Sequence, residues 1–568
     1  MKKFFSLFSA GLFIFLFSGI VLAQQQPAQQ ERLERELEKE KILRERIEKA
    51  PEKPEVEEEL PSEAVPPVKE EKVLIKKIVV SGVTYFKEEE IRKIVSPYEN
   101  KELSFREMQE IASLLTELYR TNGYITSRAY IPPQDLAEGT LEIRVLEGKM
   151  GDLEIRGNRY FKTRLIEKKI TLERGEPFNY NQLRRNLMKL NEHPDRLVRS
   201  VLTPGKERGE TDVVLEVQDR LPIHYGFEYD NFGSRFVHRD RYALTFDHNN
   251  LTGNDDILSL KYQIAEADTY ALKTLRYLLP FGEDWELGFF GARSRMKLDE
   301  ELRDTDSRGD SMLLSLFLNK YLIDEENLDL RLTGGFDYKR VRNYLLGTLN
   351  SEDALRVLKL GFDLDHADKN GRTIFTDEFS LGLPSLWGGL SAVDADASRA
   401  GAGGKFTKWN IYLLRLQKMP LNSSLLWKNN LQISPYILTA TEQFQIGGIT
   451  NNRGYPPAEK VGDEGFASSL ELSSRLGFIP ETINVPFTQD KLRDAFTVIA
   501  FYDWAHAQLH RPDAGEEKEE TLRSAGWGMR LNLPRRNLAI RLEFGWPMDE
   551  TPSDGHHFRT WLQATKSF

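Results

Sequence analysis

The sequence predicts a mainly β protein, in which a transmembrane β-barrel of sixteen antiparallel strands follows an N-terminal helix and two small α+β domains. Three observations predict this fold class. The chain begins with an export signal, residues 73–219 contain an internal repeat, and short segments of alternating apolar and polar residues follow from Leu221 onward. A soluble protein with several sheets is the alternative, because 29% of the residues are charged and membrane barrels give a weak hydropathy signal.

The first 23 residues are typical of a secretory signal peptide. Lys2 and Lys3 form a basic head, residues 4–22 are nearly all apolar or small, and Ala23 ends a cleavage pattern. The apolar run is also long enough to act as an uncleaved membrane anchor. Export is therefore predicted.

The chain contains no cysteine, which excludes disulfides, thiolate zinc sites and a cysteine nucleophile.

Residues 24–72 divide into two regions of different composition. Residues 24–49 predict an isolated helix, because Glu, Arg, Leu and Ile are frequent from residue 31 on. A narrow apolar seam runs along Leu33, Leu37, Leu43 and Ile47. Residues 50–72 are rich in Pro and Glu, so we interpret them as a linker that cannot pack. The helix is either a charged spacer or a detachable element on a tether.

Residues 73–148 and 149–220 repeat each other, and we call them module 1 and module 2. The pattern V-V-S-G-V-T-Y-F-K in module 1 matches E-I-R-G-N-R-Y-F-K in module 2 at an offset of 75 residues. Each module reads strand, helix, helix, strand, strand, which buries one sheet face and leaves an edge open to an extended peptide. Peptide-binding platforms are therefore predicted. The matched residues expected in the repeat core are Gly82, Tyr85, Phe86, Gly157, Tyr160 and Phe161.

The segments from residue 221 to residue 568 predict the barrel. Between Ile257 and Ala265, apolar residues alternate with Ser, Lys and Gln, as expected for a strand between lipid and a polar lumen. Connections after odd strands are mostly long, for example residues 341–354, and those after even strands are mostly short, as in outer-membrane barrels. Residues 477–494 are a long connection that this pattern does not explain. The final Phe568 is a common type of signal for outer-membrane insertion.

Residues 446–472 carry the pattern most informative about function. Gly and Asn residues around Arg453, Gly454 and Tyr455 favour tight turns, so that Arg453 can lie at the tip of a compact hairpin. Fifty residues on, a strand pattern places Asp503 on the face opposite an apolar row, where a carboxylate needs solvent or a cation. Arg453 and Asp503 are therefore a candidate ion pair. Two unrelated charges, one on a solvated loop and one in the lumen, are the alternative.

Together these features resemble the TpsB family, the outer-membrane transporters of two-partner secretion, which carry periplasmic POTRA modules. The resemblance covers nearly the whole chain. It implies that residues 442–465 fold back into the barrel, and that Arg453 contacts an acidic residue in an F-x-D-x-G pattern on the thirteenth strand. The matching residues are Phe501, Asp503 and Ala505, of which Ala505 departs from the family's glycine. Glu471 is expected to face the lumen from the twelfth strand.

The resemblance also implies a function. A partner exoprotein of the TpsA type, such as a haemolysin or an adhesin, would arrive unfolded in the periplasm, bind the POTRA edges and pass through the barrel to the cell surface. The helix of residues 24–49 would lie in the pore at rest. Other implied partners are outer-membrane lipid, the barrel-assembly machinery and periplasmic chaperones. A monomer without cofactor or metal is expected.

Other function classes fit the sequence less well. A barrel-assembly factor of the same superfamily would share the Arg-Gly-Tyr loop but usually carries more POTRA modules. An enzyme is not expected, because the chain has no G-x-S-x-G or H-E-x-x-H motif and its nine histidines are scattered. The net charge of −10 argues against nucleic acid. A passive porin would not need peptide-binding modules, and Arg308-Gly309-Asp310 is interpreted as a chance tripeptide.

Overall fold

The computed structural model describes residue 47, residues 56–58 and residues 72–568 except 266–268, 300–304, 326, 478 and 513–514. The predicted signal peptide lies outside the described residues, as does the predicted helix of residues 24–49 apart from Ile47. The chain divides into two compact units, one made of residues 52–222 and the other of residues 223–568 together with the N-terminal segment that contains Ile47. None of the helices in the described part of the chain has the length and apolar character of a membrane span.

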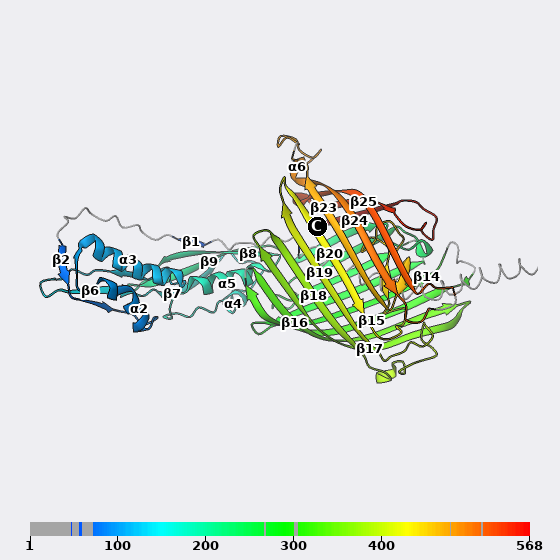
Figure 1. The fold of residues 1–568 in the computed structure, drawn as a ribbon, viewed down its shortest axis with the longest axis horizontal. Coiled ribbons are helices and arrows are strands. Elements are labelled where there is room, and N and C mark those ends of the chain that lie inside the picture. Colours follow the sequence, from blue (N-terminus) through cyan, green and yellow to red (C-terminus); the bar gives the residue numbers. More distant parts are fainter. Residues whose placement is uncertain are drawn as a thin grey trace, which may run out of the picture. The chain divides into compact units, whose positions relative to one another are not determined.

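Module 1 is a three-stranded sheet packed with two helices (Figure 1). The sheet order is β3 (Lys77–Ser81), β6 (Thr140–Leu146) and β5 (Arg128–Tyr130), with helices α2 (Glu88–Val95) and α3 (Phe105–Thr121), the 3-10 helix η1 (Ser96–Tyr98) and a side pair of β2 (Lys72–Ile75) and β4 (Lys101–Ser104). Helix α3 begins at a capping box, in which Ser104 and Glu107 each bind the other's backbone N–H. This start aims the apolar face of α3, with Ile111 and Leu115, at Leu141 of β6.

Module 2 repeats the arrangement with a fourth strand. The sheet order is β1 (Val56–Glu58), β8 (Arg196–Pro204), β9 (Glu210–Asp219) and β7 (Lys149–Arg156), with helices α4 (Thr163–Glu167) and α5 (Tyr180–Asn191). β1 comes from the region predicted to be a linker, so the expectation that residues 50–72 cannot pack is wrong for these three residues. The segment between Pro54 and Pro61 contains no proline and keeps the backbone N–H groups that a sheet requires.

The turn that carries the repeat motif is built in the same way in both modules. Gly82 and Gly157 have φ angles of 84° and 88°. A Cβ atom would lie 2.4 Å from the carbonyl oxygen of Val145 at the first position, and 2.5 Å from that of Val217 at the second. The left-handed backbone and the close approach of the last strand both require glycine. The sequence repeat thus reflects a shared contact between the turn and the sheet.

A carboxylate at the end of each module fixes the same turn. In module 1, Glu147 accepts hydrogen bonds from the backbone N–H of Thr84 at 2.7 Å and of Tyr85 at 3.0 Å. The hydroxyl of Tyr119 also donates to Glu147 at 2.7 Å, and burial together with this bond raises the pKa of Tyr119. In module 2, Asp219 accepts from three consecutive backbone N–H groups, those of Arg159, Tyr160 and Phe161.

The predicted repeat core is only partly shared between the modules. Phe161 is buried in module 2, and Phe86 packs against the core of module 1. Tyr160 is 36% exposed, so its expected place in the core is wrong. The guanidinium carbon of Arg159 lies 5.1 Å from the centre of the Tyr160 ring, which keeps the ring at the surface. Its counterpart Tyr85 instead packs among the tyrosines of module 1.

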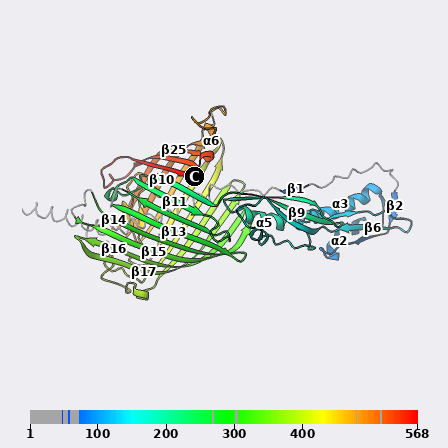
Figure 2. The same ribbon diagram turned by 180° about the vertical axis from the view of Figure 1, so that it is seen from behind.

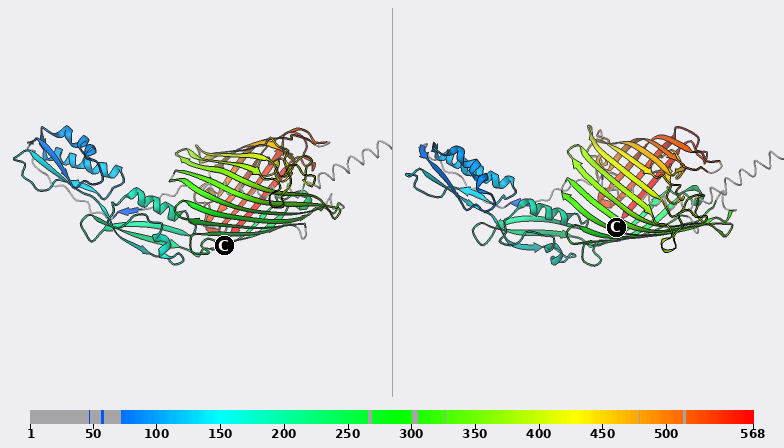
Figure 3. Two further views of the ribbon diagram at one scale, coloured as in Figure 1. Left: turned by 90° about the horizontal axis from the view of Figure 1, so that it is seen from below. Right: turned by 60° about the horizontal axis from the view of Figure 1, so that its bottom comes forward.

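In the described residues, sixteen strands close into an antiparallel barrel, which confirms the predicted fold class (Figures 1 and 2). The strands run obliquely side by side (Figure 3). The barrel closes where β10 pairs with β27, with Gly226 opposite Ser567. In chain order the strands are β10 (Ile223–Asp230), β11 (Arg241–His248), β12 (Ile257–Ile264), β13 (Tyr270–Phe281), β14 (Trp285–Lys297), β15 (Arg308–Glu325), β16 (Leu328–Leu345), β17 (Thr348–Asp368), β18 (Gly371–Gly382), β19 (Thr407–Met419), β20 (Ser423–Ile433), β23 (Glu464–Arg475), β24 (Phe496–Gln508), β25 (Glu519–Leu533), β26 (Leu538–Pro547) and β27 (Arg559–Ser567).

The two faces of the barrel wall differ as the alternation predicts. On β12, Leu260, Tyr262 and Ile264 are exposed on the outer face, where lipid would cover them. On the opposite face Gln263 is buried, and the Nζ atom of Lys261 lies 2.9 Å from a carboxylate oxygen of Glu228. The lumen is therefore lined by polar and paired charged side chains.

One connection differs from the sequence-based expectation, and the structure describes another that the pattern leaves unexplained. Residues 341–354 were expected to form a long outer loop, but β16 and β17 continue to a turn at Leu346 and Gly347. The hairpin extends because its inward residues find partners, as in the bond from Asn343 to Ser351 at 2.8 Å. Within the unexplained connection, residues 479–491 lead into the short helix α6 (Leu492–Ala495), and Val485 packs against Leu533 at the end of β25.

Candidate functional site

The segment between β20 and β23, residues 434–463, is the candidate site, and we call it the inner loop. It contains the short antiparallel pair β21 (Phe444–Ile446) and β22 (Lys460–Gly462). The turn beyond this pair is closed by hydrogen bonds from the N–H of Asn452 to Gly448 and from the N–H of Gly448 to Tyr455. A compact, internally bonded turn therefore carries Arg453.

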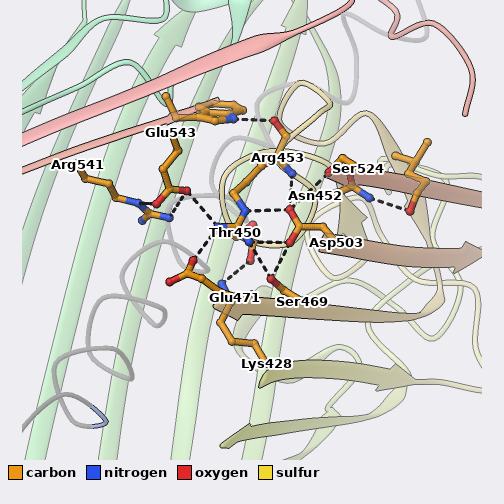
Figure 4. A network of polar contacts seen from close by, with 12 residues as sticks. Lys428, Thr450, Asn452, Arg453, Ser469, Glu471, Asp503, Ser524, Arg541 and Glu543 are labelled. Carbon is orange, nitrogen blue, oxygen red and sulfur yellow. Dashed lines mark hydrogen bonds and ion pairs between the residues drawn. The ribbon is translucent and has the colours of Figure 1, made fainter. Parts of the chain in front are cut away.

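Arg453 is 1% exposed and binds Asp503 of β24 with both its backbone and its side chain (Figure 4). The backbone N–H donates to Oδ2 at 3.0 Å, Nε donates to Oδ2 at 2.9 Å, and Nη2 donates to Oδ1 at 2.8 Å. Ser469 of β23 accepts from Nη2 and donates to Asp503 at 2.6 Å. The guanidinium carbon lies 3.4 Å from the centre of the Phe501 ring. Arg453 and Asp503 thus form a forked, charge-assisted pair.

Two further carboxylates complete the charge balance around Arg453. Its Nη1 atom donates to Glu471 of β23 at 2.8 Å and to Glu543 of β26 at 3.1 Å. Arg530 of β25 lies 2.7 Å from Glu471 and 2.9 Å from Glu543, and Arg541 also binds Glu543. Three arginines thus meet three carboxylates. We call Arg453 with Asp503, Glu471 and Glu543 the latch.

The two residues after Arg453 fit closely against the barrel wall. A Cβ atom at Gly454 would lie 2.6 Å from the Cβ atom of Ser524 and 2.7 Å from the backbone nitrogen of Pro547, so only glycine fits there. Tyr455 is fully buried and packs in one cluster with Ala505. Ala505, which stands where the family has glycine, is therefore small enough to leave room for the ring of Tyr455.

The last strand also contacts the latch. Trp561 of β27 donates its indole N–H to the backbone carbonyl of Arg453 at 2.8 Å. The tip of the inner loop is thereby bound to β23, β24, β26 and β27 together.

The base of the inner loop is held by ion pairs of its own. Glu442 binds Lys339 of β16 at 2.8 Å and Lys408 of β19 at 2.5 Å. Asp463 binds Arg399 at 2.6 Å. All five side chains are buried. The inner loop is therefore fixed to the wall at its base as well as at its tip.

Sequence reasoning missed these basal residues, together with Glu543, Arg530 and Trp561 of the barrel wall around the tip. Lys339 and Lys408 occupy inward positions of alternating strands, and this pattern could have marked them as lumen charges. The pairing of Lys339 with Glu442, 103 residues away, depends on the closure of the barrel and has no local signal.

The structure places the remaining predicted site residues as follows. Glu471 lies in the lumen on β23, the twelfth strand of the barrel. Phe568 is 68% exposed and exchanges backbone hydrogen bonds with Tyr225 of β10 beside the closing seam. Within the described ranges, no group of three His, Asp or Glu side chains is suited to hold a metal ion.

Ile47 is helical and 2% exposed, and it packs against the barrel interior. Its neighbours form an apolar area, which we call the lumen patch, on strands β18, β19 and β20. The lumen patch consists of Ile374, Tyr412, Leu414, Leu416 and Leu426.

Comparison with known proteins decides the family. A family model described as haemolysin secretion/activation protein ShlB/FhaC/HecB matches residues 209–531. The chain belongs to this family. A second model, the ShlB-type POTRA domain, matches residues 73–148, which are module 1. Members of the family are outer-membrane transporters of two-partner secretion, so the predicted family, function and location are confirmed, with the POTRA domains in the periplasm.

Individual relatives agree with this assignment. The outer membrane transporter CdiB of Dickeya dadantii (strain 3937) is 24% identical over 482 residues, which cover 83% of this chain and 80% of that protein. The heme/hemopexin transporter protein HuxB of Haemophilus influenzae (strain 86-028NP) is 22% identical over 496 residues, 84% of each chain. The solved structure of CdiB from Escherichia coli shares the fold with a TM-score of 0.70 at 22% identity, covering 97% of this chain and 99% of that one.

Proposed function

We propose that this transporter takes up one unfolded exoprotein of the TpsA type at the sheet edges of its periplasmic modules. The exoprotein then passes through the barrel, and the latch keeps the inner loop seated during transport. The proposal rests on extended sheet edges in the modules, a polar lumen and a hairpin held inside that lumen. The transporter moves its partner without acting as an enzyme.

The burial of Arg453 among three carboxylates is the observation that carries the role of the latch. Removing one partner from a buried ion network costs about 3–5 kcal/mol. Loss of Arg453 would remove the cation that binds the buried carboxylate of Asp503, while Glu471 and Glu543 would keep Arg530. A chain without the Arg453 guanidinium would have to move the tip of the inner loop or admit water around the carboxylates. The pore would then lose the surface along which the exoprotein passes.

We also propose that the helix of residues 24–49 occupies the pore at rest. The supporting observation is the burial of Ile47 against the lumen patch. An apolar area on the inner wall of a water-filled barrel is unfavourable unless something covers it. A helix with an apolar seam satisfies that requirement, and its departure would open the pore.

Export by cells that produce the transporter and its exoprotein tests the role of the latch. We expect Arg453→Ala to reduce exoprotein in the medium at least tenfold, while the barrel still shows heat-modifiable migration in gels. Arg415→Ala is the matched control. Arg415 alternates along β19 with Leu414 and Leu416 of the inner face, so it lies on the outer face, where it forms an ion pair with Asp368. Wild-type export by Arg453→Ala would refute the proposal.

A further inference from the structure

The outer face of the barrel wall carries a basic area on strands β13, β14 and β15, which Figure 2 shows side by side. The register fixes which side chains face outward. Tyr262 of β12 is exposed on the outer face and stands opposite Lys273 of β13, which stands opposite Arg293 of β14. Residues two apart along a strand share a face, so Arg295 and Lys297 also point outward, as does Arg308 opposite Lys297. All five basic side chains are exposed, and we call them the outer basic band: Lys273, Arg293, Arg295, Lys297 and Arg308.

The outer basic band begins where the apolar part of the wall ends. β10 follows the periplasmic modules in the chain, so the alternation of strand direction places Trp285, the first residue of β14, at the periplasmic end. The next outward positions of β14 are Leu287, Phe289 and Gly291, and Arg293 follows. With a rise of about 3.3 Å per residue and a strand tilt of about 40°, the stretch from Trp285 to Arg293 crosses roughly 20 Å of the membrane. The apolar surface of such barrels is about 25 Å tall, so the outer basic band lies at the headgroups of the outer leaflet.

Tyrosine side chains mark the same level of the wall. The Nζ atom of Lys273 lies 5.5 Å from the centre of the Tyr262 ring, and the guanidinium carbon of Arg308 lies 5.2 Å from the centre of the Tyr344 ring. Aromatic residues form girdles where a barrel crosses the interface between hydrocarbon and headgroups. The outer basic band therefore lies beside the outer girdle, at the level of the lipid phosphates.

Like charges face each other directly within the outer basic band. Lys273 stands opposite Arg293, and Lys297 stands opposite Arg308. Side chains at such positions have Cβ atoms about 5 Å apart, and like charges at this spacing repel each other. Arg293 has no carboxylate partner in the part of the chain that the structure describes. The arrangement therefore calls for an anion between the opposed cations.

The carboxylates nearest to the outer basic band are already occupied. Asp310 of β15 lies 3.3 Å from Arg295. Arg342 of β16 stands opposite Asp310, and Arg340 lies on the same face. Both of these arginines bind Glu352 of β17, at 3.2 Å in the case of Arg342. The excess of positive charge thus remains on this wall.

We propose that the outer basic band binds the phosphate groups of a phosphorylated lipid of the outer leaflet, of the lipid A type. Guanidinium groups bind phosphate through paired hydrogen bonds, and a phosphate between two opposed cations removes their repulsion. The acyl chains of the same molecule would cover Leu275, Leu287 and Leu316, which are exposed on the apolar wall next to the band. A free phosphate ion or an acidic peptide would leave these leucines uncovered. A ligand with a phosphorylated head and acyl chains matches both parts of the surface.

Binding of diphosphoryl lipid A to the full-length protein, refolded in detergent so that no cellular lipid is carried over, tests the site. We expect Arg293→Gln with Arg295→Gln to bind lipid A at least tenfold more weakly than the wild type does. The matched control is Lys320→Gln with Arg535→Gln, which removes the same charge at the periplasmic end, where Lys320 stands opposite Trp285. The control should bind lipid A as the wild type does. Equal affinities of the two double variants would overturn the inference.

A single substitution keeps the test decisive if the double variant does not fold. The side chain of Arg295 is 67% exposed, so Arg295→Gln opens no cavity and should leave heat-modifiable migration unchanged. We expect its affinity for lipid A to fall at least threefold, because one of the exposed phosphate-binding groups is lost. Wild-type affinity in a folded Arg295→Gln protein would overturn the inference.

Changes to the ligand separate its phosphates from its acyl chains. The wild type should bind dephosphorylated lipid A at least tenfold more weakly than diphosphoryl lipid A. Inorganic phosphate and poly-glutamate, each added at equal ionic strength, should not displace bound lipid A. Displacement by inorganic phosphate would indicate a general anion site, and displacement by poly-glutamate would indicate a surface for acidic proteins. Either displacement, or equal binding of the two lipids, would overturn the assignment to a phosphorylated lipid.

Discussion

At the scale of single residues, the latch depends on more than one ion pair. Arg453 binds Asp503 through a fork, and it also neutralises Glu471 and Glu543. A simple exchange of charge between Arg453 and Asp503 would therefore fail. Arg453→Asp would place a further carboxylate next to Glu471 and Glu543, whatever stands at position 503.

We accordingly expect the double variant Arg453→Asp with Asp503→Arg to export no more exoprotein than Arg453→Ala does. Arg453→Lys should retain part of the export, because it keeps one charge but cannot form the fork. Export assays with equal amounts of assembled barrel check both expectations. Full rescue by the double variant would mean that Glu471 and Glu543 do not act on the loop.

The repeat glycine gives a second prediction at this scale. Gly157→Ala should lower the free energy of unfolding of module 2 by about 2–4 kcal/mol, because the left-handed backbone and the contact with the Val217 carbonyl both oppose a side chain. Gly175→Ala is the control, since Gly175 has a φ angle of 83° but open space around a Cβ atom. It should cost about 1–2 kcal/mol. Pulse proteolysis of the full-length protein in urea measures both, and equal costs would show that the Val217 contact contributes nothing.

At the scale of elements, alternation and repetition made most of the fold predictable. The strands of the barrel and the order of elements in each module followed from residue periodicity, because one face of each element is apolar. The extended hairpin at Leu346 and Gly347 did not follow, since its inward side chains nearest the turn include the polar residues Asn343 and Ser351, which bond to each other across the two strands. The pairing of β1 was hidden for a different reason. Three residues carry no periodicity, and their partner strand lies about 140 residues away.

The N-terminal helix gives a prediction at the same scale. Ile47→Asp should raise the ion conductance of the protein in planar bilayers toward the value reached by deleting residues 24–49, because a carboxylate cannot pack on the lumen patch. Glu48→Gln changes the charge of the neighbouring residue and serves as the control. Unchanged conductance in both the Ile47→Asp variant and the deletion would contradict the proposed place of the helix in the pore.

At the scale of the whole molecule, the seam between β10 and β27 completes the barrel. Deleting residues 559–568 should abolish heat-modifiable migration, because β10 and β26 would each lose a partner along their length. Phe568→Ala should leave the folded barrel intact, since Phe568 contributes backbone hydrogen bonds at the seam, but should lower the amount inserted in the outer membrane. Gel migration and membrane fractionation separate these effects. A folded barrel without residues 559–568 would contradict the role of the seam.

The contact of Trp561 with the carbonyl of Arg453 links two events in assembly. Trp561 belongs to β27, the strand that closes the cylinder by pairing with β10. The hydrogen bond between Trp561 and the hairpin consequently forms only when β27 is in place, so closure of the cylinder and fixation of the hairpin tip depend on the same strand. Completion of the wall and fixation of its internal hairpin are thus coupled through one side chain.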